Sequence, residues 1–281
     1  MNRFAARFFT AAKVHATPTA GVVVASLVML IAPASVSLAG GFELRKASVG
    51  PADAYFAGRP LTIRFRAADD RERFVRVAIV NKRTRKSVHD WRLATFGTLT
   101  EYPLRWRGKS AGRIAPNGRY VVRAGPDGRP LRRIGGFKWR RHAYPVAGPH
   151  SSRGYLGEFG APRNGGRTHE GFDILSPCGT PLVAARGGRV RFSGYHGAAG
   201  NYLVIDGKGT GFDTAYMHLL RPSLLRTGDQ VRTGQPIGLV GSTGSSTACH
   251  LHFEMWTAPG WYEGGSPIDP LSHLLKWDRY S

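Results

Sequence analysis

The chain has 281 residues and a formal net charge of +22 at pH 7, and this length leaves room for about two domains after a targeting segment. An apolar fraction of 42% and six tryptophans are typical of a globular protein and exclude a low-complexity chain. From 41 to 145, 25 Lys and Arg stand against 8 Asp and Glu, whereas from 146 to 281 the numbers are 12 and 10. The basic surplus of the middle region predicts either binding to a polyanion or a solvated basic surface.

The N-terminus has the features of an export signal in their usual order. Basic side chains precede an apolar run, Gly21–Ala32, and Ser37-Leu38-Ala39 offers the small residues that signal peptidase needs. The run is shorter than the roughly 20 residues of a membrane span. We therefore predict a signal peptide over 1–39, with an uncleaved membrane anchor as the alternative. In both cases the mature protein acts outside the cytoplasm, where nucleic acid is not an expected partner.

Residues 41–136 are predicted to form a basic β-sandwich, followed by a linker over 137–149. Short strands are expected at Leu61–Ala67, Phe74–Val80, Tyr102–Gly108 and Arg119–Gly125, separated by turn residues. The segment LRWRGKSAGRIAPNGRYVVRA within this region resembles the closing hairpin of immunoglobulin-like modules of cell-surface proteins. We therefore expect an immunoglobulin-like domain, and no cluster of His, Asp, Glu or Cys marks a site in it.

Residues 150–281 are glycine-rich and strand-like, as in PLVAARGGRVRFSGY and NYLVIDG. Glycines recur where strands must turn or bulge. Helical periodicity appears only in the tail, around Leu271–Trp277. The segment therefore predicts a curved antiparallel β-domain, and the whole chain is expected to be all-β.

Three segments of this second domain place histidines in ligand-like settings. RTHEGFDIL holds His169 four residues before Asp173, DTAYMHLL holds His218, and CHLHFE holds His250 and His252. Alternation along a strand places His250 and His252 on one face. Catalytic zinc takes three protein ligands and keeps a fourth position open. His169, Asp173 and one histidine of the pair would fill that role, with the other histidine and His218 free to transfer protons.

Two further side chains are candidates for contacts near these histidines. Strand alternation places Tyr216 on the face of His218, where it would either hydrogen-bond near the site or pack in the core. It places Glu254 beside His250 and His252, where either a hydrogen bond to a ligand histidine or a structural salt bridge is expected.

The order of motifs R-x-H-x-G-x-D, G-T-P-L-V-A, Y-x-H-L, G-x-x-V-x-x-G-Q-x-I-G and H-L-H-F-E resembles the lysostaphin-type (LytM-like) zinc metallopeptidases that cut peptidoglycan peptides. The resemblance implies that His169, Asp173 and His252 bind one Zn²⁺ per chain and that His218 and His250 are catalytic. It implies an exported zinc endopeptidase, a hydrolase of the peptide cross-links of the bacterial cell wall. A zinc-activated water would attack, while the two histidines transfer protons and stabilise the oxyanion.

Two other functions, an inactive module and a carrier domain, share features with this sequence. Some relatives of the family have lost these residues, so a catalytically inactive wall-binding or amidase-activating module is the alternative. A lipoyl- or biotinyl-like carrier domain needs a lysine at a hairpin tip, and neither Lys208 nor Lys276 lies in that context. The basic domain would bind anionic wall polymers, pack over the active site as an inhibitor or act as a spacer, and the sequence leaves these roles open. The sequence leaves open which peptide bond is cut and the oligomeric state.

The two cysteines, Cys178 and Cys249, are expected to form a disulfide. A lone pair in an exported protein favours a bond over free thiols. Cys178 follows the strand of Asp173, and Cys249 precedes the strand of His252. Because both ligand segments must converge on one ion, the flanking cysteines should lie close together.

Overall fold

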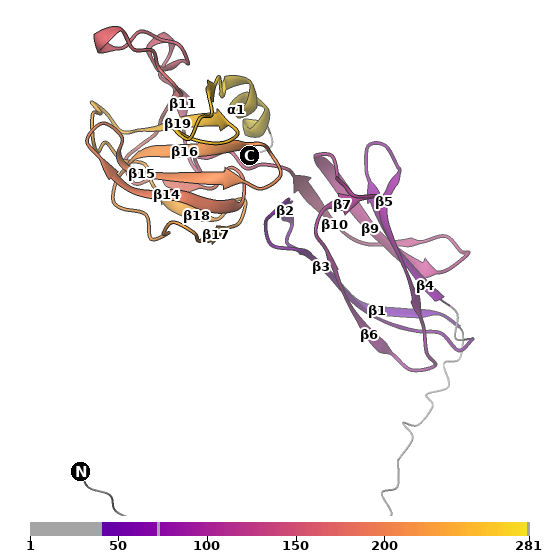
Figure 1. Ribbon diagram of the computed structural model, residues 1–281. Coiled ribbons are helices and arrows are strands. Elements are labelled where there is room, and N and C mark those ends of the chain that lie inside the picture. The colour runs from indigo at the N-terminus through magenta and orange to yellow at the C-terminus, as the bar shows by residue number, and fades with distance from the viewer. Residues whose placement is uncertain (1–40, 72–73, 280–281) are drawn as a thin grey trace, which may run out of the picture. The chain divides into compact units, whose positions relative to one another are not determined.

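The computed structural model describes residues 41–71 and 74–279 (Figure 1). The predicted signal peptide lies outside these residues. Two β-rich regions follow one another along the described chain, each with a hydrophobic core of its own. Within the described ranges, no helix is both long and apolar enough to span a membrane.

The first region is built from ten strands in two main sheets. The strands are β1 (Glu43–Gly50), β2 (Asp53–Tyr55), β3 (Leu61–Ala68), β4 (Phe74–Asn81), β5 (Ser87–Ala94), β6 (Thr100–Trp106), β7 (Lys109–Ser110), β8 (Arg113–Ile114), β9 (Gly118–Pro126) and β10 (Arg132–Arg140). One sheet has the order β1-β3-β6 and the other β2-β10-β9-β4-β5, while β7 and β8 form a small hairpin. The four strands predicted from the sequence are present, within two residues at each end.

The two main sheets share one core because their strands alternate between apolar and polar side chains. In β3, Leu61, Ile63 and Phe65 are buried while Arg64 and Arg66 face solvent. Strand β10 continues through the first four residues of the segment predicted as a linker. The immunoglobulin-like character of this region stays a prediction.

The second region holds the histidine-bearing segments. Its elements are β11 (Ser151–Ser152), η1 (Tyr155–Gly157), η2 (Asn164–Gly166), β12 (Phe172–Leu175), β13 (Pro181–Val183), β14 (Gly188–His196), β15 (Gly200–Gly207), β16 (Phe212–Leu219), β17 (Gln230–Val231), β18 (Pro236–Leu239), β19 (His250–Thr257), β20 (Pro267–Ile268) and α1 (Leu271–Asp278). The main sheet has the order β11-β12-β19-β16-β15-β14-β17, with β20 beside β19. Figure 1 shows β14, β15 and β16 side by side in orange. Helix α1 lies where the sequence predicted helical periodicity, and β19 lies between β12 and β16 at the centre of the site described below.

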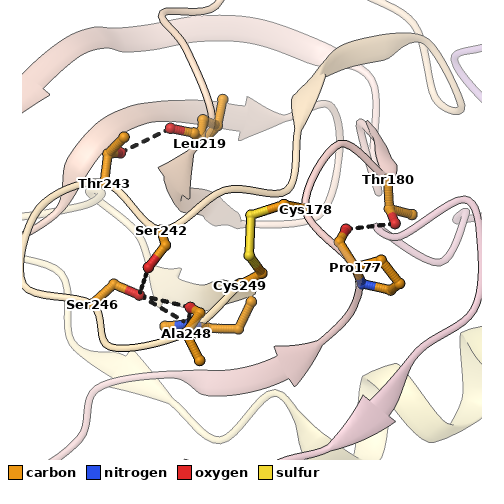
Figure 2. The surroundings of a disulfide bond; sticks show 10 residues. Pro177, Cys178, Thr180, Leu219, Ser242, Thr243, Ser246, Ala248 and Cys249 are labelled. Carbon is orange, nitrogen blue, oxygen red and sulfur yellow. Dashed lines mark hydrogen bonds between the residues drawn. A yellow bond between two sulfur atoms is a disulfide. The ribbon is translucent and has the colours of Figure 1, made fainter.

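A disulfide joins Cys178 and Cys249, with a Cα–Cα distance of 5.2 Å. Figure 2 shows it linking the loop after β12 to the loop before β19. Hydrogen bonds stiffen that second loop, since Ser242 donates to Ser246, which in turn donates to the carbonyl of Ala248. The predicted pairing is therefore present, and it ties together the ends of two neighbouring strands.

Candidate metal centre

Strand pairing brings the predicted ligands together. In the register of β12 and β19, Asp173 lies opposite His252. His169 reaches the same place from the loop before β12, and Gly171 makes this possible. A Cβ at Gly171 would lie 2.5 Å from the Phe253 carbonyl oxygen and 2.9 Å from the ring of His252. The glycine of the H-x-G-x-D segment thus lets the backbone approach β19 closely.

Three ligand atoms converge at this point. His169 Nε2 lies 2.8 Å from His252 Nδ1 and 3.1 Å from Asp173 Oδ1, and the last two atoms are 2.9 Å apart. Ligands at about 2.0–2.1 Å from a tetrahedral zinc are ~3.3 Å apart. The three atoms are therefore spaced nearly as a zinc ion would hold them, and all three side chains are buried.

The hydrogen bonds on the far sides of the two rings fix their tautomers. His169 Nδ1 lies 2.8 Å from the Glu158 carbonyl oxygen, which can only accept, so Nδ1 carries the proton and Nε2 offers a lone pair. His252 Nε2 lies 2.9 Å from Glu254 Oε1, so on the same argument Nδ1 offers a lone pair. Two imidazole lone pairs and one carboxylate oxygen thus face each other, a donor set that fits Zn²⁺.

The electrostatics of the cluster favour a cation between these atoms. Burial opposes ionisation of Asp173, but its polar and electrostatic interactions with His169 and His252 outweigh it and lower the pKa of Asp173 below its ordinary value. Burial likewise lowers the pKa of His252, but Asp173 and Glu254 outweigh it and raise that pKa to about 9. In the absence of a metal, a proton is therefore attracted to the place where a metal ion would bind.

A guanidinium holds the second oxygen of Asp173. Arg153 Nη1 donates to Asp173 Oδ2 over 3.2 Å, and Nη2 of the same side chain donates to Thr247 Oγ1 over 3.3 Å. This leaves Oδ1 to face the two histidines. Sequence reasoning missed Arg153, because it lies in the loop before η1 and no spacing rule links it to the motifs.

His218 reaches the site by a route that strand alternation does not predict. In β16, Tyr216 pairs with Phe253 and Met217 pairs with His252, so simple alternation would turn His218 into the core with Tyr216. The backbone of His218 instead has φ = 61°, a left-handed conformation that breaks the alternation. Its ring lies 4.8 Å from that of His250 and 5.9 Å from that of His252.

Tyr216 does not lie beside the histidines. It is fully buried in the core, where its hydroxyl accepts a hydrogen bond from the backbone N–H of Ala185 over 2.8 Å. Of the two uses considered for this residue, core packing is the one that the structure has. The error arose because alternation was assumed to continue through His218.

His218 and His250 form a pair of neutral bases at the edge of the cluster. His218 Nδ1 donates to the Thr243 carbonyl over 2.7 Å and His250 Nδ1 to the Ala248 carbonyl over 2.8 Å, so each Nε2 keeps a lone pair. His250 Nε2 lies 3.6 Å from Asp173 Oδ1. Burial lowers the pKa of His218 to about 4, and burial also lowers that of His250. Both rings are therefore uncharged at neutral pH and able to accept a proton.

Part of this chain is similar in sequence to known peptidases. Residues 167–270 match the model of peptidase family M23. The peptidoglycan DD-endopeptidase ShyC of Vibrio cholerae is 44% identical over 88 residues, which are 31% of this chain and 20% of that protein. The DD-carboxypeptidase/endopeptidase Mpg of Neisseria meningitidis is 35% identical over 150 residues, 53% of this chain and 32% of that protein.

Among solved structures, the catalytic domain of the antimicrobial peptidase lysostaphin from Staphylococcus simulans is 33% identical, with 45% of this chain and 92% of that domain covered and a TM-score of 0.39. The chain spans a fifth to a third of the length of the two curated relatives above. The matches confirm the class predicted from the order of motifs, a metallopeptidase. The matched segment, 167–270, is similar to the domains of family M23.

Proposed function

We propose that the second region is an exported zinc endopeptidase that hydrolyses the peptide cross-links of bacterial peptidoglycan, with one zinc per chain. The observation that carries the proposal is the convergence of three metal-facing lone pairs, from His169, Asp173 and His252, beside two neutral histidines. Bound zinc polarises a carbonyl and lowers the pKa of water toward ~7. The chain itself supplies the groups that accept and return protons.

The two neutral histidines are proposed to handle protons. Each has Nδ1 occupied by a backbone carbonyl and Nε2 unprotonated. One of them accepts the proton of the attacking water at Nε2, and the resulting Nε2–H can donate to the developing oxyanion before the proton passes to the leaving amine. The other accepts a hydrogen bond from the attacking water at its own Nε2 and helps to orient it. His218 and His250 are the catalytic residues of this proposal, and Glu254 holds His252 in place.

The substrate is proposed from the relatives. ShyC is described as a peptidoglycan DD-endopeptidase and Mpg as a DD-carboxypeptidase/endopeptidase, and each is similar to part of this chain. An enzyme of this class would act in the periplasm or in the cell wall, in agreement with the predicted export signal. The alternative is a catalytically inactive module of the same fold, either wall-binding or amidase-activating.

The first prediction tests the metal ligands. His252→Ala should lose zinc and activity together, because two remaining ligands are too few for a catalytic zinc site. Metal analysis of the purified chain and mass analysis of the fragments released from peptidoglycan measure the two properties. The unchanged chain should hold one zinc and convert cross-linked peptidoglycan fragments into uncross-linked ones, whereas an inactive module would leave the cross-links intact. Full zinc content in the His252→Ala protein would show that the ligands are assigned wrongly.

The basic first region is proposed to bind anionic wall polymers. Strand register places Arg76 opposite Arg92, and Arg123 opposite Arg133, on exposed positions of the five-stranded sheet. Asp90 pairs with Arg76, and Asp127 pairs with Arg92. The surplus of cations on this sheet supports the proposal, since a polyanion would be attracted to it.

A further inference from the structure

Glu254 lies at the centre of a hydrogen-bond arrangement that extends beyond the candidate metal centre. One carboxylate oxygen, Oε1, accepts from His252 Nε2 over 2.9 Å. The other, Oε2, accepts from the indole N–H groups of Trp256 and Trp261 over 2.7 and 2.8 Å. The carboxylate is 3% exposed, so it depends on these protein donors.

The two indoles reach Glu254 from different parts of the chain. His252, Glu254 and Trp256 alternate on one face of β19, so the first indole is supplied by the strand itself. Trp261 comes from the loop after β19, in which its backbone N–H donates to Asp213 Oδ2 over 2.9 Å. The same carboxylate of Asp213 pairs with Arg191 at 2.8 Å.

The loop after β19 packs closely against Asp213 and the neighbouring aromatic rings. A Cβ at Gly260, which has φ = 138°, would lie 2.7 Å from Asp213 Oδ2. The ring of Trp261 packs against Phe192 and Tyr202, with centroid distances of 5.7 and 5.5 Å. The indole of Trp261 is thus fixed at both its backbone and its ring, and it is aimed at Glu254.

The direction of these hydrogen bonds determines which ring nitrogen of His252 carries the proton. An indole N–H can only donate, so two indoles on Oε2 keep that oxygen an acceptor and fix the plane of the carboxylate. Oε1 then faces His252 and accepts its Nε2–H, which leaves the Nδ1 lone pair for the metal. A carboxylate without these donors would be free to rotate away from Nε2, so the ring proton would no longer be held there, and a proton on Nδ1 would block the ligand atom.

We propose that Trp256 and Trp261 are positioning residues that act through Glu254 to present His252 Nδ1 to the metal. This inference rests on the proposed function, because it takes the metal at His169, Asp173 and His252 to be zinc. Partners of metal ligands beyond the direct coordination shell commonly change metal affinity 10- to 100-fold. The two indoles are not part of any motif that identified the site in the sequence.

The test uses the full chain with Trp256→Phe and Trp261→Phe combined. This double variant keeps an aromatic ring at each position and removes both N–H donors. Zinc Kd is measured by competition with a chelator of known affinity, and urea unfolding of the metal-free protein is measured in parallel. We expect the Kd to rise about 10- to 100-fold, and Glu254→Gln to give a similar rise. Trp106→Phe is the matched control, because it removes an indole that donates to the Lys109 carbonyl in the first region.

The outcomes separate this inference from the proposed function. A Kd within twofold of the unchanged chain in the double variant overturns the inference and leaves the proposed function standing. An equal rise in Trp106→Phe also overturns it, since the effect would then be general destabilisation. If the double variant does not fold, Trp261→Phe alone decides, and its Kd must rise. A parent chain that binds no zinc refutes the proposed metal site and this inference with it.

Discussion

His218 is turned toward the candidate metal centre by its own backbone. The left-handed φ of 61° is uncommon for a residue other than glycine, and it is held by hydrogen bonds on both sides. The His218 backbone N–H donates to the Ala199 carbonyl over 2.8 Å, and its ring donates to the Thr243 carbonyl. A residue held away from its ordinary conformation in this way is fixed by the surrounding loops, which is consistent with a role in the reaction.

The prediction at this scale concerns proton transfer. His218→Ala and His250→Ala should each keep zinc, since neither is a ligand in the proposal. Each should lose activity by a factor of order 10² or more, the scale of general acid–base groups. Zinc content and the rate of peptidoglycan digestion measure the two effects, and His89→Ala in the first region is the control. Near-normal digestion by both variants would remove these histidines from the mechanism.

The identity of the site residues was accessible from the sequence, but their geometry was not. Motif spacing was enough to predict that His169, Asp173 and one histidine of the His250 and His252 pair converge. The choice of His252 came from the resemblance to the lysostaphin-type family. The sequence left open whether Tyr216 lies near the site or packs in the core, because alternation cannot foresee the positive φ of His218 two residues later. Hydrogen-bond partners such as the Thr243 carbonyl depend on loop conformation, which no local pattern encodes.

At the scale of elements, the disulfide joins the end of one ligand strand to the start of another. The Cys178–Cys249 bond closes a loop with a sequence separation of 71 residues. The chain-entropy model gives on the order of 4 kcal/mol of stabilisation for a loop of this length. The double variant Cys178→Ser with Cys249→Ser should therefore unfold at a lower urea concentration. An unchanged midpoint, with the bond verified in the parent by non-reducing mass mapping, would contradict this expectation.

Strands were predicted better than the loops between them. Apolar and polar alternation identifies a strand because the two faces meet different surroundings, and this holds for β3 and β9. Alternation along β19 would also have placed Trp256 beside Glu254. It could not have placed Trp261, because that residue reaches the same carboxylate through a loop anchored on Asp213.

A histidine packed against helix α1 should make the free energy of unfolding depend on pH. His142 stacks on Trp277 of α1 with a centroid distance of 4.7 Å. Burial, with help from the charges of Arg186, His273, Arg141 and Lys276, lowers the pKa of His142 to about 3. Between the ordinary value of about 6.5 and this value, the unfolded chain binds a proton that the folded chain does not.

The free energy of unfolding should therefore fall as the pH decreases through this window, by at most about 1.4 kcal/mol per pH unit for one proton. His142→Phe keeps an aromatic ring against Trp277 and removes the titrating group. Urea unfolding at pH 7 and pH 4 should show a smaller difference for this variant than for the parent chain. An equal difference in both proteins would mean that His142 does not contribute to acid sensitivity.

For the whole molecule, the charge is distributed unevenly along the chain. The region with the candidate metal centre is nearly balanced in charge, whereas the region before it carries most of the surplus. Arg123 and Arg133 face each other on neighbouring strands β9 and β10 of the five-stranded sheet. Both are exposed, and their guanidinium groups donate to the carbonyl oxygens of Leu131 and Gly135. Two exposed guanidinium groups side by side on a sheet are a suitable contact for a phosphate-bearing polymer.

The final prediction tests this surface in the full chain. Arg123→Gln with Arg133→Gln should lower the salt concentration that elutes the protein from immobilised poly(glycerol phosphate), because contacts between exposed charges weaken once the Debye length shortens below about 10 Å. Arg189→Gln with Arg226→Gln, which removes the same charge from the second region, is the matched control and should elute close to the parent. Digestion of soluble peptidoglycan fragments should remain unchanged in the first pair, since it lies outside the proposed site. Equal shifts in both pairs would mean that net charge, and not this sheet, determines retention.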